Sequence, residues 1–416
     1  MTMRVQASLI LIMALAMMGL ASCDHYNCAS GPNLGTSCTS SGSGLGSTGT
    51  GTGTGTGAAS AFVFAGDPAG TIDGYTLSTS ASTFAATTGY TGPAAPANIQ
   101  ATGMAVAQGL YLYAMYYETG QIYGWSIGSD GSLTAISDSP FSASYLLNSA
   151  EPGGWQTMIT NPTGTLLFVE DLAGTAIYTY QIGQGGVLTA TNNGSPQIVP
   201  GLPENMATDG LGKFLYVTLE PVGGGSAEIG AYAISSTGSL TVVPGSPFSY
   251  PMYQVQGEPS GKYLIGTASD SGISSLYVFN IQSTGTNAGA IALVTGGPFS
   301  TVYPPYSVAV QPNTGGDLIY SFSLSTTTGG YNPIEGYELN TSTGALTAIS
   351  GSPFATVSSG NLGLFDQSGT LLSVYSVSGG TAQLGVLAVG SGGALAQPVS
   401  PIDLTALGPW VITDPN

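Results

Sequence analysis

Cationic side chains are almost absent from this sequence. Among its 416 residues only Arg4, Lys213 and Lys262 carry a positive charge, against 21 Asp and Glu residues, and His25 is the single histidine. A protein that binds nucleic acid needs several Lys or Arg contacts to the phosphates. We therefore expect no nucleic-acid partner, and phosphorylated small molecules are disfavoured for the same reason.

The scarcity of histidine and cysteine restricts the available chemistry further. His25 and all three cysteines, Cys23, Cys28 and Cys38, lie near the N-terminus. The rest of the chain has no imidazole base for a Ser-His-Asp or Cys-His arrangement and no ligands for a His-based zinc site. Carboxylates remain as acid/base groups, and glycoside hydrolases use them in pairs.

The N-terminus carries an export pattern. Residues 1–22 show a short basic start, an apolar run and the ending Leu20-Ala21-Ser22 before Cys23, which resembles a bacterial lipoprotein signal. This resemblance implies that Cys23 is lipidated; a plain signal peptide and an N-terminal membrane helix are the alternatives. We expect a lipoprotein that is anchored through Cys23 to a membrane of the bacterial cell envelope and faces the periplasm or the cell surface.

Residues 23–60 are rich in Gly, Ser and Thr and predict a flexible tether. Cys28 and Cys38 lie in this segment and could form a disulfide in an oxidising compartment. We expect the folded part of the chain to be a monomer, held away from the membrane by this tether.

A motif that ends in Pro-Phe recurs along the rest of the chain. It stands at Pro140, Pro247, Pro298 and Pro353, with looser copies at Pro196 and Pro401. Each interval carries the same four segments, typified by "NMATD", "FLYVTL", "EIGAYAIS" and "SLTVV", which alternation and Gly turns identify as strands. Repeats of about 50 residues with four strands each are typical of a β-propeller.

The ends of the chain fix the number of blades. Six complete repeats run from about residue 96 to 405. Three strands precede them ("AFVFAGD", "TIDGYTLS" and "STFAATT"), and one segment that matches a first strand, "GPWVITDPN", follows them. We therefore predict an all-β protein over 61–416: a seven-bladed β-propeller of four-stranded blades, with the first blade closed by the C-terminal strand. Since proline cannot donate to a strand ladder, we expect each Pro-Phe motif to end the outer strand of its blade, and its Phe to pack between blades.

These repeats resemble a known family. "FLYVTL" with the upstream "DGLGK", the "STGSL" turn and the "GSPF" ending are similar to the YVTN-type repeats of lactonase-like seven-bladed propellers, which include 6-phosphogluconolactonase-like proteins. The resemblance covers nearly all of 61–416. It implies Arg, His and Glu residues around the top of the channel that hold and hydrolyse a lactone. This sequence departs from that pattern, because the propeller region has no Arg and no His.

We therefore expect a binding or scaffolding module without lactonase activity. The alternative is a sugar-lactone hydrolase that uses carboxylates, for which Glu170 and Glu220 are the candidate catalytic residues. Lys213 and Lys262 each follow an acid by four residues, Asp209 and Glu258, and we expect two exposed ion pairs across the turn between first and second strands.

Most acids fall in the loops on one face of the predicted propeller, which we call the top face: the loops from second to third strands and from one blade to the next. The end of the second strand is acidic in five consecutive blades, at Asp67, Glu118, Glu170-Asp171, Glu220 and Asp270. These acids could keep the protein soluble, act as a carboxylate pair, or bind Ca²⁺ through Glu118, Glu170, Asp171, Glu220 and Asp270. No Asp-x-Asp-x-Asp loop is present. Apart from calcium, we expect no cofactor.

Two tryptophans, Trp155 and Trp410, open first strands near the top face, and Tyr253 and Tyr306 lie at similar positions. Such rings stack on sugars or pack between blades. The candidate binding residues are thus Glu118, Trp155, Glu170, Asp171, Glu220, Asp270 and Trp410. Since an acidic protein without bases gains little positive charge in acid, we also expect it to work in an acidic envelope, where the repulsion among the carboxylates of the top face relaxes.

Overall fold

The structure is a computed structural model that describes residues 60–67, 70–80, 82–86, 99–143, 157–171, 175–268, 273–312, 318–324, 332–355, 358–378, 381–404 and 408–415. The predicted signal, the anchor Cys23, the pair Cys28 and Cys38, and the candidates Trp155 and Asp270 lie outside the described residues.

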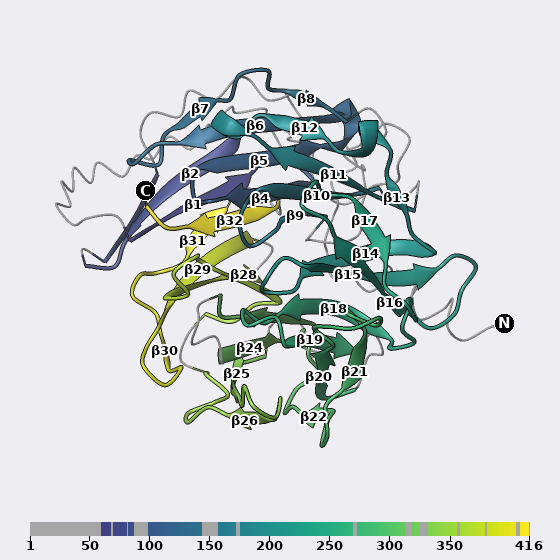
Figure 1. Ribbon diagram of the computed structural model, residues 1–416. Helices are drawn as coiled ribbons and strands as arrows, with labels where there is room; N and C mark the ends of the chain where they lie inside the picture. Colours follow the sequence, from purple (N-terminus) through teal and green to yellow (C-terminus); the bar gives the residue numbers. More distant parts are fainter. Residues whose placement is uncertain are drawn as a thin grey trace, which may run out of the picture. The chain divides into compact units, whose positions relative to one another are not determined.

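Seven antiparallel sheets form the blades of a propeller (Figure 1). Blade 1 has the order β3-β2-β1-β32 and consists of β1 (Ala61–Gly66), β2 (Ile72–Ser78), β3 (Thr83–Ala86) and β32 (Trp410–Thr413). Blade 2 consists of β4 (Gly103–Ala107), β5 (Tyr111–Tyr116), β6 (Gln121–Ile127), β7 (Leu133–Ala135) and β8 (Phe141–Ser142). Blade 3 consists of β9 (Met158–Thr160), β10 (Leu166–Asp171), β11 (Ala176–Ile182), β12 (Leu188–Ala190) and β13 (Gln197–Ile198).

The other four blades repeat this order. Blade 4 consists of β14 (Gly201–Thr208), β15 (Phe214–Pro221), β16 (Glu228–Ile234) and β17 (Leu240–Val242). Blade 5 consists of β18 (Met252–Gly257), β19 (Tyr263–Ala268), β20 (Ser275–Ile281), β21 (Ile291–Leu293) and β22 (Phe299–Ser300). Blade 6 consists of β23 (Ser307–Val310), β24 (Leu318–Phe322), β25 (Glu335–Leu339) and β26 (Leu346–Ala348). Blade 7 consists of β27 (Leu362–Phe365), β28 (Leu371–Ser378), β29 (Thr381–Val389), β30 (Leu395–Ala396) and β31 (Ile402–Leu404).

The C-terminal strand closes the ring. β32 pairs with β1, with Phe64 opposite Val411 and Ala65 opposite Trp410, and Figure 1 shows β32 in yellow beside β1 in purple. The innermost strands β32, β4, β9, β14, β18, β23 and β27 each contact the innermost strands of both neighbouring blades. The predicted seven blades and the predicted closure are therefore confirmed.

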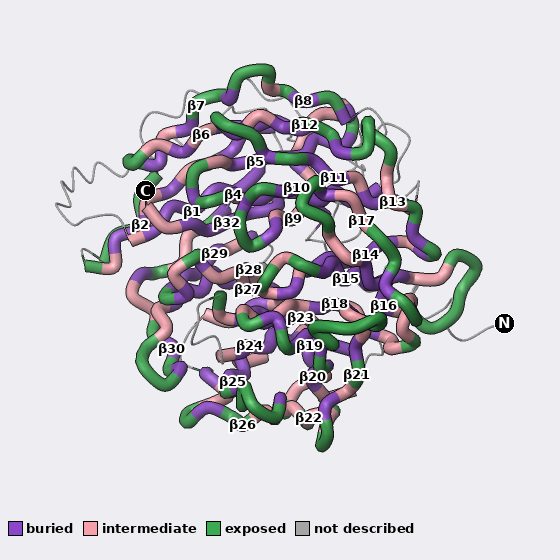
Figure 2. The backbone as a smooth tube through the Cα atoms, viewed as in Figure 1, coloured by how far each residue is buried: buried purple, intermediate pink, exposed green. Residues whose placement is uncertain are grey.

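The hydrophobic core lies between blades. Phe62 and Phe64 of blade 1 pack in one cluster with Leu112 and Trp125 of blade 2, and the other clusters likewise join neighbouring blades, for example blades 6 and 7 through Tyr320 and Leu372. Figure 2 shows burial along the inner strands and exposure in the turns. Because both faces of each inner blade strand are covered, strands such as β1 and β10 are buried along their whole length.

The Pro-Phe motif does not end the outer strand, and this part of the prediction is wrong. In blade 2 the strand β7 pairs with the second half of β6, and after Pro140 the chain pairs with β6 again through β8. The looser copies behave alike, since β13 pairs with β11 and β31 pairs with β29. The third strand of each blade is longer than its outer partner, which has two to four residues. This difference leaves part of the third strand's edge open for the chain to pair with.

The serine and the phenylalanine of the motif have separate structural roles. The backbone N–H of Gly124 donates to Ser139 Oγ (3.0 Å), and Ser246 and Ser352 accept the equivalent hydrogen bonds in blades 4 and 6. These bonds give backbone N–H groups of the third strand an acceptor at the point where the outer strand is interrupted. Phe141 lies in a cluster with Met158 and Leu167 of the next blade, as expected for packing between blades.

The tyrosine of "FLYVTL" joins neighbouring blades at the turn between the third and the outer strand. Tyr216 donates its hydroxyl hydrogen bond to the carbonyl oxygen of Gly289 (3.0 Å), in the turn between β20 and β21 of the next blade. Tyr113 and Tyr320 make the same bond to Gly186 and Gly393. Gly289 has a positive φ of 90°, and a Cβ there would lie 2.5 Å from the Phe214 ring. These repeat residues are therefore architectural.

The two predicted ion pairs are replaced by buried turn contacts. Asp209 is buried, and its Oδ1 accepts hydrogen bonds from the backbone N–H groups of Lys213 (2.6 Å) and Phe214 (2.7 Å). Glu258 is also buried and accepts from Ser260, while the Lys262 ammonium donates to the carbonyl oxygen of Thr341. The prediction of exposed pairs is wrong, because the backbone of the tight turn needs the carboxylates as acceptors.

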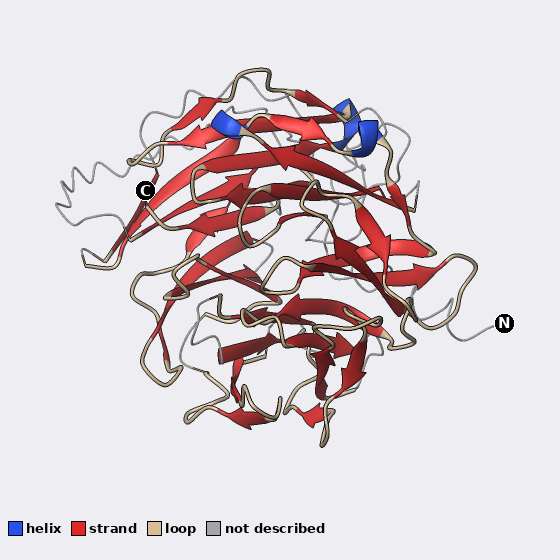
Figure 3. Ribbon diagram, in the orientation of Figure 1, coloured by secondary structure: helices blue, strands red, loops and turns tan. Residues whose placement is uncertain are grey.

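Helical structure is confined, among the described residues, to three short 3₁₀ turns (Figure 3): η1 (Tyr117–Thr119), η3 (Gln184–Gly186) and η4 (Asn192–Gly194). Within this part of the chain, no helix has the length and apolar character needed to cross a membrane.

Candidate functional site

Three successive blades place partly exposed polar side chains at the same point, where the innermost strand begins at the top face. The pairing of β14 with β15 is interrupted between Pro203 and Asn205, which leaves Glu204 outside the ladder. The pairing of β18 with β19 is interrupted between Met252 and Gln254, which leaves out Tyr253 in the same way. A bulge of this kind redirects a side chain, and bulges are common beside functional sites.

The third of these residues is Tyr306, directly before β23. The hydroxyl oxygens of Tyr253 and Tyr306 lie 2.5 Å apart, and the ring centroids are 4.7 Å apart at an angle of 37°. Burial, followed by the neighbouring Tyr306 and Glu204, raises the pKa of Tyr253 well above its usual value. The Tyr253 phenol therefore remains protonated across the physiological pH range.

Hydrogen bonds between neighbouring blades hold these residues in place. The Thr218 hydroxyl donates to the carbonyl oxygen of Tyr253, and the Thr267 hydroxyl donates to that of Tyr306, both at 3.2 Å. Asn205 and Gln254, which follow Glu204 and Tyr253, accept backbone hydrogen bonds from the next innermost strand. The residues at these positions are thus held by hydrogen bonds to the neighbouring blades.

Glu170 takes the place of these threonines in blade 3. Val169, Val217 and Gly266 each pair with the first core residue of their innermost strand, and the next residues are Glu170, Thr218 and Thr267. By this equivalence the side chain of Glu170 is directed toward Glu204, as the hydroxyl of Thr218 is directed toward the backbone carbonyl of Tyr253. Glu170 is only 1% exposed, and neither carboxylate oxygen has a hydrogen-bond partner. Burial, and secondly the charge of Glu204, raises its pKa well above the usual value.

Glu204 interacts electrostatically with both Glu170 and Glu220. Burial, followed by the charge of Glu220, raises the pKa of Glu204 to about 7. Glu220 lies on β15 and is half-buried. We name Glu170, Glu204, Glu220, Tyr253 and Tyr306 the axial cluster. Lys213 and Lys262, the cations among the described residues, lie in the turns at the opposite ends of the strands and cannot offset its charge.

The other predicted site residues are dispersed. Glu118 is exposed in η1, and Asp171 is buried at the end of β10. Trp410 is buried, stacks on Tyr375 at 4.9 Å and donates to Ser373 Oγ, which is the packing alternative. Within the described part of the chain, no group of three or more His, Cys, Asp or Glu residues could hold a metal ion. The axial cluster therefore contains two of the predicted residues, Glu170 and Glu220.

Sequence reasoning did not select Glu204 or the buried Glu335. Glu335 accepts hydrogen bonds from the backbone N–H groups of Val302 and Tyr303 and from the Tyr337 hydroxyl, so it holds the loop before Tyr306. An acid of this kind cannot be distinguished from a surface acid without knowing which loop covers it. Glu204 could have been found by aligning it with Tyr253 and Tyr306.

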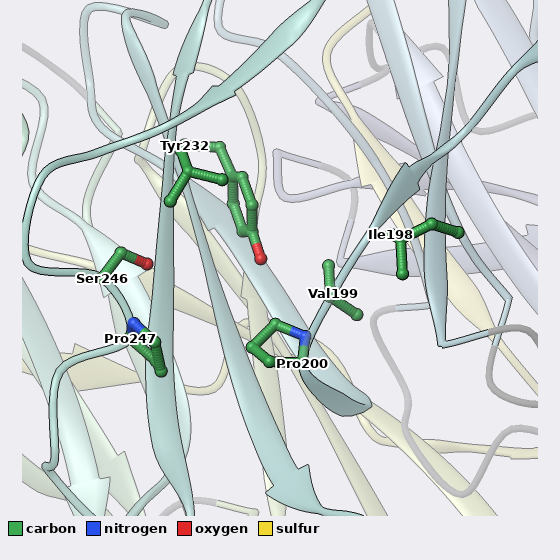
Figure 4. A pocket seen from close by; sticks show the side chains of 7 residues that line it. Ile198, Val199, Pro200, Tyr232, Ser246 and Pro247 are labelled. Atoms are coloured by element: carbon green, nitrogen blue, oxygen red, sulfur yellow. The ribbon is translucent and has the colours of Figure 1, made fainter.

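A separate groove of about 360 Å³ lies on the outer parts of blades 3 and 4 (Figure 4). It is lined by Ile198, Val199, Pro200, Tyr232, Val242, Ser246 and Pro247. The Tyr232 hydroxyl extends toward Val199 and Pro200 in Figure 4, and burial raises the pKa of this phenol to about 12. The lining has no carboxylate or cation, so the groove offers no acid/base chemistry near neutral pH.

The closed ring of four-stranded blades defines a seven-bladed β-propeller. Its fold matches that of a putative 6-phosphogluconolactonase from Bacteroides uniformis, with a TM-score of 0.62, 12% identity and coverage of 85% of this chain and 99% of that one. A second putative 6-phosphogluconolactonase, from Bacteroides fragilis, matches with a TM-score of 0.60, 14% identity and coverage of 86% and 98%. The periplasmic gluconolactonase of Pseudomonas aeruginosa matches with a TM-score of 0.59, 12% identity and coverage of 86% and 99%.

These similarities show the fold, since the identities are low. No protein-family model matches the sequence, and no curated protein matches it. The resemblance of the repeats to lactonase-like propellers is thus confirmed at the level of architecture.

Proposed function

We propose that the protein is a binding module of the cell envelope, which holds a small ligand at the axial cluster and does not hydrolyse lactones. One observation carries this proposal: equivalent positions in three successive blades present a carboxyl group and two phenol hydroxyls, all partly exposed. Preformed sites with a few convergent polar groups are typical of ligand binding. Lipid anchoring at Cys23 would keep this module at a membrane surface, as the N-terminal sequence suggests.

The alternative is a sugar-lactone hydrolase that uses Glu170 and Glu220. The structural neighbours with lactonase names support this alternative, and a buried acid with a raised pKa is the kind of group that donates protons near neutral pH. The burial of Glu170 counts against it, because a side chain that is 1% exposed cannot contact a substrate without rearrangement. The absence of Arg and His from residues 61–416 also removes the groups that the family resemblance implies. Binding is therefore the better-supported function.

Two assays on the purified soluble protein test this choice. A panel of neutral saccharides, sugar lactones and small amines is screened for an increase in melting temperature, and hydrolysis of glucono-1,5-lactone is followed in parallel. We expect at least one ligand to stabilise the protein, with the effect reduced in Tyr253→Phe, and no hydrolysis above the spontaneous rate. Hydrolysis that is lost in Glu170→Gln or Glu220→Gln would establish the enzyme instead.

A further inference from the structure

The axial cluster lacks a positive charge that its acids require. Glu170 is buried with both oxygens unpartnered, Glu204 is half-buried, and Glu220 lies beside Glu204. A buried carboxylate without a partner is strongly unfavourable, so such a group either keeps its proton or takes a cation as its partner. The propeller has two lysines and no arginine, and both lysines lie at the other end of the blades. Among the residues that the structure describes, no cationic side chain can therefore supply the missing partner.

We propose that the axial cluster binds the ammonium group of a small organic amine. This inference rests on the proposed binding function and specifies its ligand class. The ammonium group would lie against the Glu204 carboxylate, with Glu170 behind it and Glu220 beside it. An ammonium has three N–H donors and one positive charge. It can therefore donate to the half-buried carboxylates of Glu204 and Glu220 and offset the negative charge of the cluster.

The tyrosine pair favours an organic cation over a metal ion. The rings of Tyr253 and Tyr306 lie next to each other, and Tyr253 lies next to Glu204. The face of a phenol ring attracts an ammonium group. The cluster does not form a metal-binding group of three or more acidic or imidazole ligands within the described residues. The rings could also cover the carbon chain of the amine, which a bare ion would not use.

Anionic and uncharged ligands fit these groups less well. A phosphate or carboxylate would meet three acids and no cation. A saccharide could donate hydroxyl hydrogen bonds, but it would leave the negative charges of the acids uncompensated. Of the three ligand classes, only an amine removes the repulsion between Glu204 and its neighbours.

The inference predicts a specific dependence of affinity on pH. Burial and Glu220 hold the pKa of Glu204 at about 7, so the carboxyl is largely protonated at pH 6 and largely ionised at pH 8. The groups that act on it are Glu220 from β15, Glu170 from β10 and Tyr253 from β18. We expect the affinity for an amine to rise about tenfold from pH 6 to pH 8.

Isothermal titration with putrescine and spermidine tests the inference, with butane-1,4-diol as the uncharged control. Titrations are made at about 0.15 M salt, where loosely attracted ions are screened. We expect saturable binding of the amines, no heat with the diol, and affinity at least about tenfold lower in Glu204→Gln. The matched control is Glu228→Gln, which removes the same charge from a surface position of the same blade, and it should keep its affinity within about twofold. If Glu204→Gln does not fold, Glu220→Gln should show a loss in the same direction.

Two outcomes overturn the inference. Equal losses in Glu204→Gln and Glu228→Gln would show diffuse attraction to an acidic protein and no site. The absence of saturable amine binding would also overturn it. In that case, binding of a saccharide or lactone that depends on Tyr253 leaves the proposed function standing, whereas no binding of any ligand in the panel overturns both.

Discussion

The hydroxyl oxygens of Tyr253 and Tyr306 lie 2.5 Å apart although the two residues begin the innermost strands of different blades. One phenol donates its hydroxyl hydrogen to the other. Repetition of the blade creates this contact, because both tyrosines occupy the same position of their repeats.

The first prediction compares this contact with an architectural one. Tyr253→Phe removes a partly exposed hydrogen bond and should lower the free energy of unfolding by about 1 kcal/mol or less. Tyr216→Phe should lower it by about 1–3 kcal/mol, because the buried carbonyl oxygen of Gly289 loses its side-chain donor. Denaturant titration at pH 7 measures both values. A larger loss in Tyr253→Phe than in Tyr216→Phe would contradict the assignment of Tyr253 to a ligand site.

The second prediction concerns the unpartnered Glu170. Its folded-state pKa is raised, so the folded protein holds this proton more tightly than the unfolded chain does, and stability is lost as the pH rises. Glu170→Gln keeps the shape and removes this titration. The variant should match the wild type at pH 5 and be more stable at pH 8, by an amount that urea unfolding at the two pH values measures. If Glu170→Gln is less stable than the wild type at both pH values, the carboxyl has a native partner.

The third prediction extends this linkage to the whole protein. Burial raises the pKa of Asp73 and of Asp414 to about 6, with added contributions from Asp67 and from a hydrogen bond to Asp366, respectively. Acids with raised folded-state pKa values contribute stability that is complete below about pH 4 and is lost as the pH rises through 6 to 7. The melting temperature should therefore be higher at pH 5 than at pH 8.

The pair Asp366 and Asp414 provides the matched variant for this prediction. In Asp414→Asn the amide can donate to Asp366 at every pH, so the variant should lose less stability between pH 5 and pH 8 than the wild type does. Scanning calorimetry at several pH values shows both trends. A wild-type melting temperature that is lower at pH 5 than at pH 8 would refute the linkage.

The repeat pattern was sufficient to predict the blades, because alternation and turn residues are local properties of the chain. The course of the chain after the Pro-Phe motif was not predictable in this way. It depends on β6 being longer than β7, which leaves Gln121 and Ile122 free to pair with Ser142 and Phe141. Such pairing depends on the relative lengths of neighbouring strands, which the residues of the motif do not reveal.

Only part of the axial cluster was predicted, because burial also depends on packing between distant parts of the chain. Glu170 and Glu220 stood out as acids at strand ends, but the burial of Glu170 depends on the neighbouring blade that covers it. Asp209 and Glu258 were assigned to exposed ion pairs, and they are buried because the turn backbone donates to them. The sequence shows which residues repeat, whereas the three-dimensional packing decides which of them are exposed.

The last prediction concerns the closure of the ring. Deletion of residues 409–416 removes β32. One edge of β1 is then unpaired along residues 62–65, while its other edge still pairs with β2. It also removes the buried side chains of Trp410, Val411 and Ile412 from clusters that join blade 1 to blades 2 and 7. We expect the truncated protein to lose cooperative thermal unfolding and to self-associate through the open edge.

The point variant Trp410→Ala provides a graded comparison, because it should keep the β1–β32 pairing and lose about 3–5 kcal/mol from the cavity it creates. Size-exclusion chromatography and circular dichroism distinguish the two effects. A truncated protein that remains monomeric and melts cooperatively near the wild-type temperature would show that the remaining strands of blade 1 hold the ring without β32.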